Sequence, residues 1–277
     1  WNGNSMKARK SLRQAVFTLC IAALFPLELH ANDYSAQQSK TSRWPVIRAN
    51  LFAADRQIYT DDTISLITPK RAENAAIVPI SVNANIEQTT DLYISKIYLV
   101  VDDNPSPVVG VFTMSQFSGL ASLSTRIRVN AYSNVRAIAE TSDGKLHMAV
   151  NFVKASGGCS APAGTNDEEA IKRRGKMKLR QQKHDDLLQV QLMISHPNYS
   201  GLQIDQVSRN WIPADYVNEL QVSFDNDAVI SFVGGISMSE NPSLRFYFKP
   251  GKEGSFLADV KDSQGREYSQ RWPLAEL

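Results

Sequence analysis

Hydrophobic and polar residues alternate along much of the chain with a period of two. The alternating segments lie at 78–82, 92–101, 126–131, 146–152, 190–194, 220–224, 244–248 and 256–260. Turn-forming sequences such as Asp143-Gly144 and Lys249-Pro250-Gly251 separate these segments. Short alternating strands between regularly spaced turns are typical of β-sandwiches. The pattern therefore predicts an all-β protein with two β-sandwich domains, at residues 43–154 and 186–277.

Two local features refine the first predicted domain. Pro79 interrupts the segment 78–82, and a proline cannot donate a hydrogen bond to a neighbouring strand. This segment is therefore predicted to be an edge strand. The only helix expected in the domain is a short one near residues 44–53.

The segment 155–185, between the two domains, has a different composition. It begins with small residues (ASGGCSAPAG) and continues into a charged stretch. Thr165 or Asn166 could cap a helix whose first turn is acidic. The basic run from Lys172 to Lys183 is interpreted as the solvated face of a linker in preference to a docking site. We therefore expect a flexible and partly helical linker.

The N-terminus has the layout of a secretory signal peptide, predicted at residues 6–31. Basic residues follow Met6, a short apolar run extends from Ala15 to Pro26, and the small residue Ala31 offers a cleavage point. The apolar run is too short to span a bilayer comfortably, which disfavours the alternative of a retained membrane anchor. The sequence therefore predicts export and a periplasmic location, with no membrane span after cleavage.

Charge and composition exclude several other classes of protein. Hydrophobic residues make up 43% and charged residues 21% of the chain, which is typical of a folded globular protein. Removing the predicted signal would change the net charge from +2 to −1. A nearly neutral chain gives no electrostatic reason to expect nucleic-acid binding.

The chain has two cysteines, and only one of them lies outside the predicted signal peptide. Cys20 lies in the signal, whereas Cys159 follows two glycines at the start of the linker. A single cysteine in an exported protein suggests a reactive thiol or an intermolecular disulfide. No histidine has ligand-like spacing around Cys159, so neither a metal site nor a cofactor is expected.

Covalent carriage on Cys159 requires access, mobility and a thiolate. Gly157 and Gly158 are expected to form a flexible arm that exposes the sulfur. One alternative is a cysteine enzyme that uses His147 or His184 as its base, but a mobile arm suits catalysis poorly. Another is a buried inert cysteine, for which the local sequence offers no apolar setting. The favoured interpretation is a carrier that is not itself an enzyme.

At these residues the chain resembles a fusion of the two subunits of SoxYZ, the sulfur-compound carrier of bacterial sulfur oxidation. The SoxY-like features are residues 71–80 (RAENAAIVPI) and 153–159 (VKASGGC). The SoxZ-like features are His196-Pro197, Ile212-Pro213, Ile236-Ser237, Glu240-Asn241-Pro242 and residues 244–248 (LRFYF). The resemblance covers about residues 43–277.

The resemblance implies immunoglobulin-like sandwiches and a cysteine, Cys159, that carries sulfur species between partner enzymes. The family arm usually ends the SoxY chain, whereas here Ser160-Ala161-Pro162 follow and the chain continues. Fused chains of this kind resemble the SoxYZ-like carriers associated with PQQ-dependent quinoprotein dehydrogenases. The implied partners are periplasmic redox or sulfur-oxidation enzymes. A non-covalent accessory module for a quinoprotein dehydrogenase is the alternative function.

Overall fold

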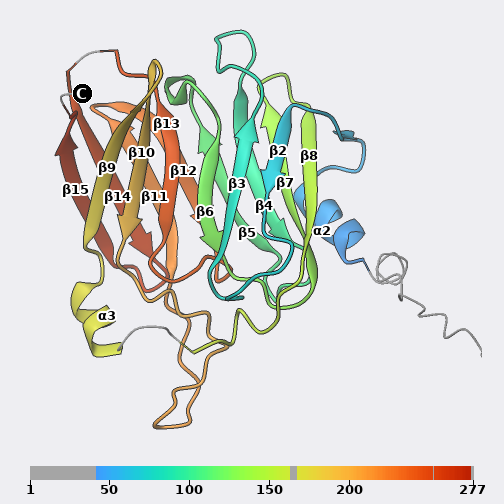
Figure 1. Ribbon diagram of the computed structural model, residues 1–277, viewed down its shortest axis with the longest axis vertical. Helices are drawn as coiled ribbons and strands as arrows, with labels where there is room; N and C mark the ends of the chain where they lie inside the picture. Colours follow the sequence, from blue (N-terminus) through green and yellow to red (C-terminus); the bar gives the residue numbers. More distant parts are fainter. Residues whose placement is uncertain (1–41, 163–166, 252, 276–277) are drawn as a thin grey trace, which may run out of the picture. The chain divides into compact units, whose positions relative to one another are not determined.

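The computed structural model describes residues 42–162, 167–251 and 253–275. The predicted signal peptide and the predicted helix cap at Thr165 or Asn166 lie outside these ranges. The regular secondary structure of the described part is mainly β-strand, in two sheets, which confirms the predicted fold class (Figure 1).

The two sheets are stacked, with the six-stranded sheet in front of the nine-stranded sheet in Figure 1. The order of the larger sheet is β1 (Ile58–Tyr59), β8 (Leu146–Val153), β7 (Ser133–Thr141), β4 (Ile94–Val101), β5 (Val108–Met114), β12 (Asp227–Gly234), β11 (Val217–Phe224), β14 (Ser255–Asp262) and β15 (Glu267–Pro273). The order of the smaller sheet is β2 (Ile64–Ile67), β3 (Val78–Ala84), β6 (Leu123–Ile127), β13 (Ser243–Phe248), β10 (Leu187–Ile194) and β9 (Met177–His184). Both sheets therefore contain strands from both halves of the chain.

In the larger sheet the two halves meet where β5 pairs with β12. The pairing is antiparallel and runs from Met114 opposite Ile230 to Gly110 opposite Gly234. Phe112 and Phe232 face each other there, with ring centroids 4.9 Å apart. A Cβ atom on Gly110 or Gly234 would come within 2.2 Å of the Phe232 ring, so only glycine fits at these two positions. The halves thus share one continuous sheet and one apolar core.

In the smaller sheet the halves meet through polar contacts around β6 and β13. Arg245 pairs with Ser124, and the backbone N–H of Arg128 donates to the carbonyl of Ser237 over 2.8 Å. The buried Ser239 hydroxyl donates to the carbonyl of Ala76 over 2.8 Å. These contacts fix loops of the second half against the end of β6.

The structure corrects the predicted linker at 155–185. Residues Met177–His184 form strand β9, which pairs with β10 along its whole length. Its polar residues point to solvent while Met177 packs in the core. Lysines and arginines on an edge strand discourage pairing with other chains, so this basic run is a protected edge of the second sandwich.

The structure also corrects the prediction that the Pro79 segment is an edge strand. Strand β3 lies between β2 and β6. However, β2 pairs only with residues 81–84, whereas β6 pairs with residues 78–82. Pro79 therefore lies where β3 has a partner on one side only, and its missing N–H removes no hydrogen bond from the sheet.

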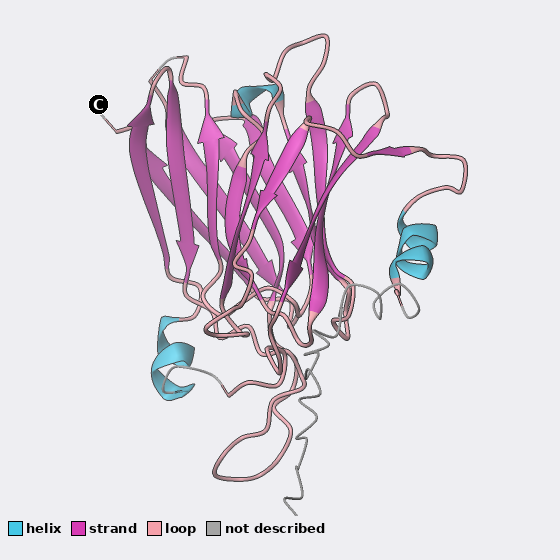
Figure 2. Ribbon diagram, turned by 45° about the vertical axis from the view of Figure 1, so that its right-hand side comes forward, coloured by secondary structure: helices cyan, strands magenta, loops and turns pink. Residues whose placement is uncertain are grey.

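Two helices and one short 3₁₀ turn (η1, Gln116–Ser118) complete the described structure. Helix α2 (Trp44–Leu51) confirms the predicted short helix and packs Ile47 against Val100, Ile138 and Leu146 of the larger sheet. Helix α3 (Asp167–Arg173) precedes β9, and Figure 2 shows the two helices at opposite sides of the strands. None of the described helices is long and apolar enough to cross a membrane.

Candidate functional site

Cys159 does not lie on an exposed arm. Its side chain is fully buried, while its neighbours Ser160 and Pro162 are exposed. It occupies a turn in the loop that follows β8, where the two halves of the chain meet. The expectation of a solvent-reachable sulfur on a mobile segment is therefore wrong for this state of the molecule. We call residues 155–162 the cysteine segment.

One side of the cysteine segment is held by the first half of the chain. The N–H groups of Gly157 and Gly158 donate to the carbonyls of Asn130 and Val129, over 2.8 and 3.2 Å. The N–H of Cys159 donates to the side-chain oxygen of Asn130 over 3.3 Å. The fully buried Asn104 in turn accepts a hydrogen bond from the N–H of Asn130 and donates to the carbonyl of Arg128. This network fixes the loop that carries the segment's partners.

The other side is held by residues 198–203 of the second half. The Ser200 hydroxyl donates to the carbonyl of Cys159. The Gln203 side chain donates to the carbonyl of Ala161 over 2.8 Å. Polar groups from both halves therefore hold the turn, and we call this set of partners the seat of Cys159.

The two glycines before Cys159 have different physical roles. Gly157 has a φ of +76°, a conformation that costs residues with a Cβ about 1–2 kcal/mol. At Gly158, a Cβ atom would lie 2.1 Å from the carbonyl oxygen of Ala75 and 2.6 Å from that of Val129. In the described state these glycines allow tight seating of the segment rather than free movement.

A buried guanidinium lies next to the cysteine. Arg128 is 1% exposed, and it donates to the carbonyls of Gly158 and Asn198 over 3.0 and 3.1 Å. It thus bridges the cysteine segment and the second half. Burial raises the pKa of the Cys159 thiol to about 11, and the charge of Arg128 opposes that rise. The seated thiol is therefore protonated at neutral pH and is a poor nucleophile.

Neither histidine that was considered as a catalytic base contacts the cysteine. His147 pairs with Asp61, with Nδ1 2.8 Å from Oδ2, and His184 packs on the ring of Tyr247. Within residues 42–162, 167–251 and 253–275, no histidine is hydrogen-bonded to Cys159. The arrangement lacks the thiol–imidazole pair that a cysteine hydrolase requires.

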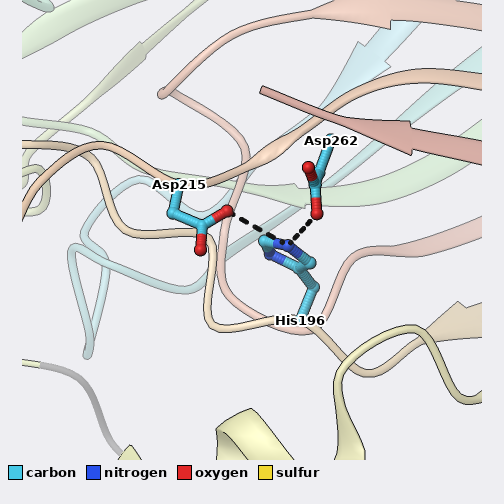
Figure 3. A group of neighbouring side chains, drawn as sticks. All are labelled: His196, Asp215 and Asp262. Atoms are coloured by element: carbon cyan, nitrogen blue, oxygen red, sulfur yellow. Dashed lines mark ion pairs between the residues drawn. The ribbon is translucent and has the colours of Figure 1, made fainter. Parts of the chain in front are cut away.

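A cluster of ionisable groups that the sequence pattern does not indicate lies close to the seat, in the second half. His196, Asp215 and Asp262 converge there (Figure 3). The buried His196 Nε2 lies 3.6 Å from Asp215 Oδ1 and 3.5 Å from Asp262 Oδ2. Its Nδ1 accepts a hydrogen bond from the N–H of Asn198 over 3.1 Å, so a neutral ring carries its proton on Nε2. Burial lowers the pKa of His196, and the two carboxylates oppose this shift.

The spacing of these three residues would admit a metal ion, but their other partners do not suit one. Arg266 pairs with both carboxylates, and Arg174 lies 3.1 Å from Asp215 Oδ2. The positive charges of two arginines therefore already balance the negative charges of the two carboxylates. The cluster fits an internal salt-bridge network that supports the chain from His196 to Ser200, which forms one wall of the seat.

Spacing along the sequence could not have found this cluster. His196 follows β10, Asp215 lies just before β11, and Asp262 ends β14. The only sequence signal was the His196-Pro197 pair, which the family resemblance included without assigning it a role.

Two protein-family models match the chain in tandem. The model described as sulfur oxidation protein SoxY matches residues 48–159, and the model described as sulphur oxidation protein SoxZ matches residues 177–273. The first match ends at Cys159. None of the curated proteins compared with the chain matches it.

Solved structures match parts of the chain. The sulfur carrier protein SoxY from Chlorobium limicola f thiosulfatophilum is 25% identical over 44% of this chain and 98% of its own, with a TM-score of 0.35. A superoxide reductase (neelaredoxin) from Ignicoccus hospitalis is 15% identical over 35% of this chain and 93% of its own, with a TM-score of 0.32. With TM-scores this low, we draw no functional conclusion from either.

Proposed function

Because the chain belongs to the SoxYZ family, with a SoxY domain followed by a SoxZ domain, we propose that it is a covalent sulfur carrier whose attachment site is Cys159. The observation that carries the proposal is the position of this residue. Cys159 ends the SoxY match and is seated by hydrogen bonds from the SoxZ half. It is also the only cysteine after residue 20.

The seated state is a resting state of this carrier. A fully buried and protonated thiol cannot attack a sulfur donor, so loading requires the cysteine segment to leave its seat. Residues 157–161 are suited to release because they are held mainly by separate hydrogen bonds, each of which water can replace at a net cost of about 1 kcal/mol. Seating then protects the thiol between encounters with partner enzymes.

Loading proceeds by thiol–disulfide exchange in this proposal. The Cys159 thiolate attacks a sulfur–sulfur bond of the donor, a new bond forms to Cys159, and the other sulfur leaves with the electron pair of the broken bond. The thiol proton passes to solvent. No external oxidant is needed, because the donor bond that breaks and the carrier bond that forms are at the same oxidation level.

The chain acts as a substrate of partner enzymes in this scheme and not as an enzyme itself. The described residues supply no base next to the thiol, and the one strong charge beside it, Arg128, is a permanent cation that cannot accept the thiol proton. Activation of the donor and release of the product therefore belong to the partners. Their class is the enzymes of sulfur oxidation.

Intact-protein mass spectrometry of the chain purified from its native source, without reductant, tests the proposal. We expect a sulfur-containing adduct on Cys159 that reductant removes. The Cys159→Ser variant should carry no adduct and should not support sulfur oxidation in cells that lack the wild-type chain. A native chain that is never modified, together with a fully functional Cys159→Ser variant, would reject the carrier role.

Two further parts of the proposal concern location and partner. The signal-like segment 6–31 supports a periplasmic location. The fusion of the two domains in one chain supports partnership with a PQQ-dependent quinoprotein dehydrogenase. Cell fractionation tests the proposed location. Affinity capture with the wild-type and Cys159→Ser chains tests the proposed partner. A covalent carrier should hold the partner's product on the chain only when Cys159 is present. Capture of a quinoprotein dehydrogenase by both chains, with full activity of the variant, would support the non-covalent accessory role instead.

A further inference from the structure

A long hairpin projects from the second half of the chain next to the seat. It connects β10 to β11 and extends beyond the ends of the strands (Figures 1 and 2). The N–H of Ile212 donates to the carbonyl of Gln203 over 2.9 Å, and the N–H of Asp205 donates to the carbonyl of Asn210 over 2.9 Å. These cross-strand bonds give the projection a defined conformation. We call residues 203–212 the apolar hairpin.

Three large apolar side chains of the apolar hairpin are exposed. Ile204 is 40%, Val207 is 94% and Trp211 is 65% exposed. Ile204 and Trp211 lie opposite each other in an antiparallel bridge, which places their side chains next to each other on one face. Neither apolar core of the described residues includes any of the three. Single exposed apolar residues are ordinary, but three on one short hairpin indicate a surface that another molecule covers.

The apolar hairpin is joined directly to the cysteine segment. The side-chain nitrogen of Gln203 donates to the carbonyl of Ala161 over 2.8 Å, and Ile204 is the next residue along the chain. A stable protein interface covers about 800 Å² on each partner, which corresponds to a patch of about 16 Å radius. The base of the hairpin lies well inside a patch of that size centred on the cysteine segment. An enzyme that reacts with Cys159 therefore also covers this base.

We propose that the apolar hairpin is the docking element for the sulfur-oxidation enzyme that loads Cys159, and that it inserts into an apolar recess beside the entrance of that enzyme's active site. Trp211 supplies the main contact, because tryptophan is enriched among the residues that dominate binding energy. Ile204 packs beside it, and Val207 extends the contact to the tip. The fixed conformation of the hairpin reduces the entropy that is lost on binding.

The charge near the tip favours a protein recess over a lipid surface. Asp205 accepts hydrogen bonds from the N–H groups of Val207 and Ser208, over 3.2 and 2.6 Å. Hydrogen bonds from the backbone and side chain of Ser208 hold the pKa of Asp205 below its usual range, so the carboxylate is ionised at neutral pH. An ionised carboxylate within the apolar patch opposes insertion into a membrane. A protein recess can offer it hydrogen-bond donors instead.

This inference rests on the proposed function, because it assigns a docking surface to the enzyme that acts on the same thiol. Enzymatic and chemical loading of the full chain separate docking from the chemistry of that thiol. An extract of cells of the native source that lack the chain supplies the loading enzyme, with thiosulfate as the donor. Tetrathionate loads the thiol without an enzyme. Intact mass spectrometry measures the adduct on Cys159 in both reactions.

Substitutions on the apolar hairpin should weaken enzymatic loading through the concentration of chain that it requires. In Trp211→Ser we expect the concentration for half-maximal loading to rise about thirtyfold, with an unchanged maximal rate, and in Val207→Ser about three- to tenfold. Trp211→Phe should recover most of the loss, because it keeps an aromatic ring. Tetrathionate loading should be unchanged in all three variants, since the hydrogen bonds from Ser200 and Gln203 to the cysteine segment remain.

Phe117→Ser is the matched control for removal of an exposed aromatic ring. Phe117 is 46% exposed and follows β5 at the end away from Asn104, so its loss should leave both reactions unchanged. Equal half-maximal concentrations for the wild-type chain and Trp211→Ser would overturn the proposal. A matching change in tetrathionate loading would also overturn it, because the hairpin would then act on the seat and not on the enzyme.

Two other occupants of the apolar hairpin give different results. Sedimentation with vesicles of phosphatidylethanolamine and phosphatidylglycerol tests a lipid surface, and sedimentation of the chain alone tests a second copy. Either association would overturn the proposal if it disappears in Trp211→Ser while enzymatic loading is unchanged.

Failure of the proposed function itself has a separate signature. The extract would then leave the wild-type chain unmodified at every concentration, although tetrathionate still loads it. That result would reject the carrier role and the docking role with it. Normal enzymatic loading of both the wild-type chain and Trp211→Ser would reject the docking role alone.

Discussion

The two halves of the chain meet in two regions that are held together in different ways. At the β5–β12 junction the contact is a continuous ladder of backbone hydrogen bonds covered by an apolar core that includes Phe112 and Phe232. At the seat of Cys159 the contact consists of separate hydrogen bonds. Arg128 donates to the carbonyl of Asn198, and Ser200 and Gln203 donate to the carbonyls of Cys159 and Ala161. The first is built like the interior of a domain, and the second like a contact that can open.

This difference shows how a fused carrier can be rigid and mobile at once. Breaking the junction would expose a large apolar area, and burial of such area stabilises by about 25 cal/mol per Å². Releasing the cysteine segment exposes one thiol and a few polar groups, which water can solvate. The junction thus keeps the second half next to the segment, so the seat remains in place while the segment leaves and returns.

The largest effect is expected from substitution at the junction. Phe232→Ala removes a ring that fills the space between Gly110 and Gly234, and such core truncations cost about 3–5 kcal/mol of the free energy of unfolding. Urea unfolding followed by circular dichroism measures this. Phe117→Ala is the matched control, because Phe117 is 46% exposed. If both variants lose the same stability, the junction is not the rigid element described here.

The pH dependence of thiol reactivity separates the seat from an ordinary exposed cysteine. The seated thiol has its pKa raised to about 11, so the seated state is fully favoured below the ordinary thiol pKa and is lost as pH rises through the raised value. Alkylation by iodoacetamide should therefore accelerate about tenfold per pH unit well beyond pH 8.5, by more than about a hundredfold in total. A plateau near pH 8.5, as expected for the unfolded chain, would show that the thiol is not seated in solution.

Closer packing at Gly158 should keep the segment out of its seat. The added Cβ of Gly158→Ala would clash with two backbone carbonyls that cannot move aside, and overpacking of this kind costs about 1–3 kcal/mol. We expect alkylation of Cys159 at pH 7.5 to accelerate about ten- to hundredfold, with little change in urea unfolding. Gly251→Ala is the control, since a Cβ there meets nothing within 4 Å. An unchanged rate in Gly158→Ala would mean that this close packing does not hold the segment.

The smallest effect is expected from a single hydrogen bond of the seat. Ser200→Ala removes the donor to the carbonyl of Cys159, and one such bond contributes about 1 kcal/mol, or roughly a fivefold faster alkylation. Ser81→Ala is a matched control, because it removes a comparable bond to Ser124 away from the seat. Equal rates in the two variants would indicate that the second half does not help to hold the segment.

The sequence predicted the fold class well and the surroundings of the cysteine poorly, for physical reasons. Strand β10 was predictable because its residues alternate between core and solvent. Strand β7 was missed because it is buried on both faces, with Ala137 and Ala139 in the main core and Ile138 under α2, so alternation is lost. Alternation of apolar and polar residues marks strands with one buried face and is absent from strands with two.

The seat could not have been predicted because its residues come from distant parts of the chain. Val129, Asn130 and Ser200 lie far from Cys159 in sequence, and the local sequence GGCSAPAG contains nothing bulky enough to bury a thiol. The small residues predict mobility, whereas the glycine at 158 is required by the close approach of two other backbone segments. Glycine in sequence alone does not separate these two meanings.

The rate at which Cys159 is loaded in the native chain tests the account most directly. Tetrathionate transfers a thiosulfonate group to a thiolate and releases thiosulfate, and intact mass spectrometry follows the reaction over time. Global unfolding is measured under the same conditions by hydrogen exchange in β11. The account predicts that loading is much faster than global unfolding, because only the cysteine segment has to open. Loading that proceeds no faster than the whole chain unfolds would contradict it.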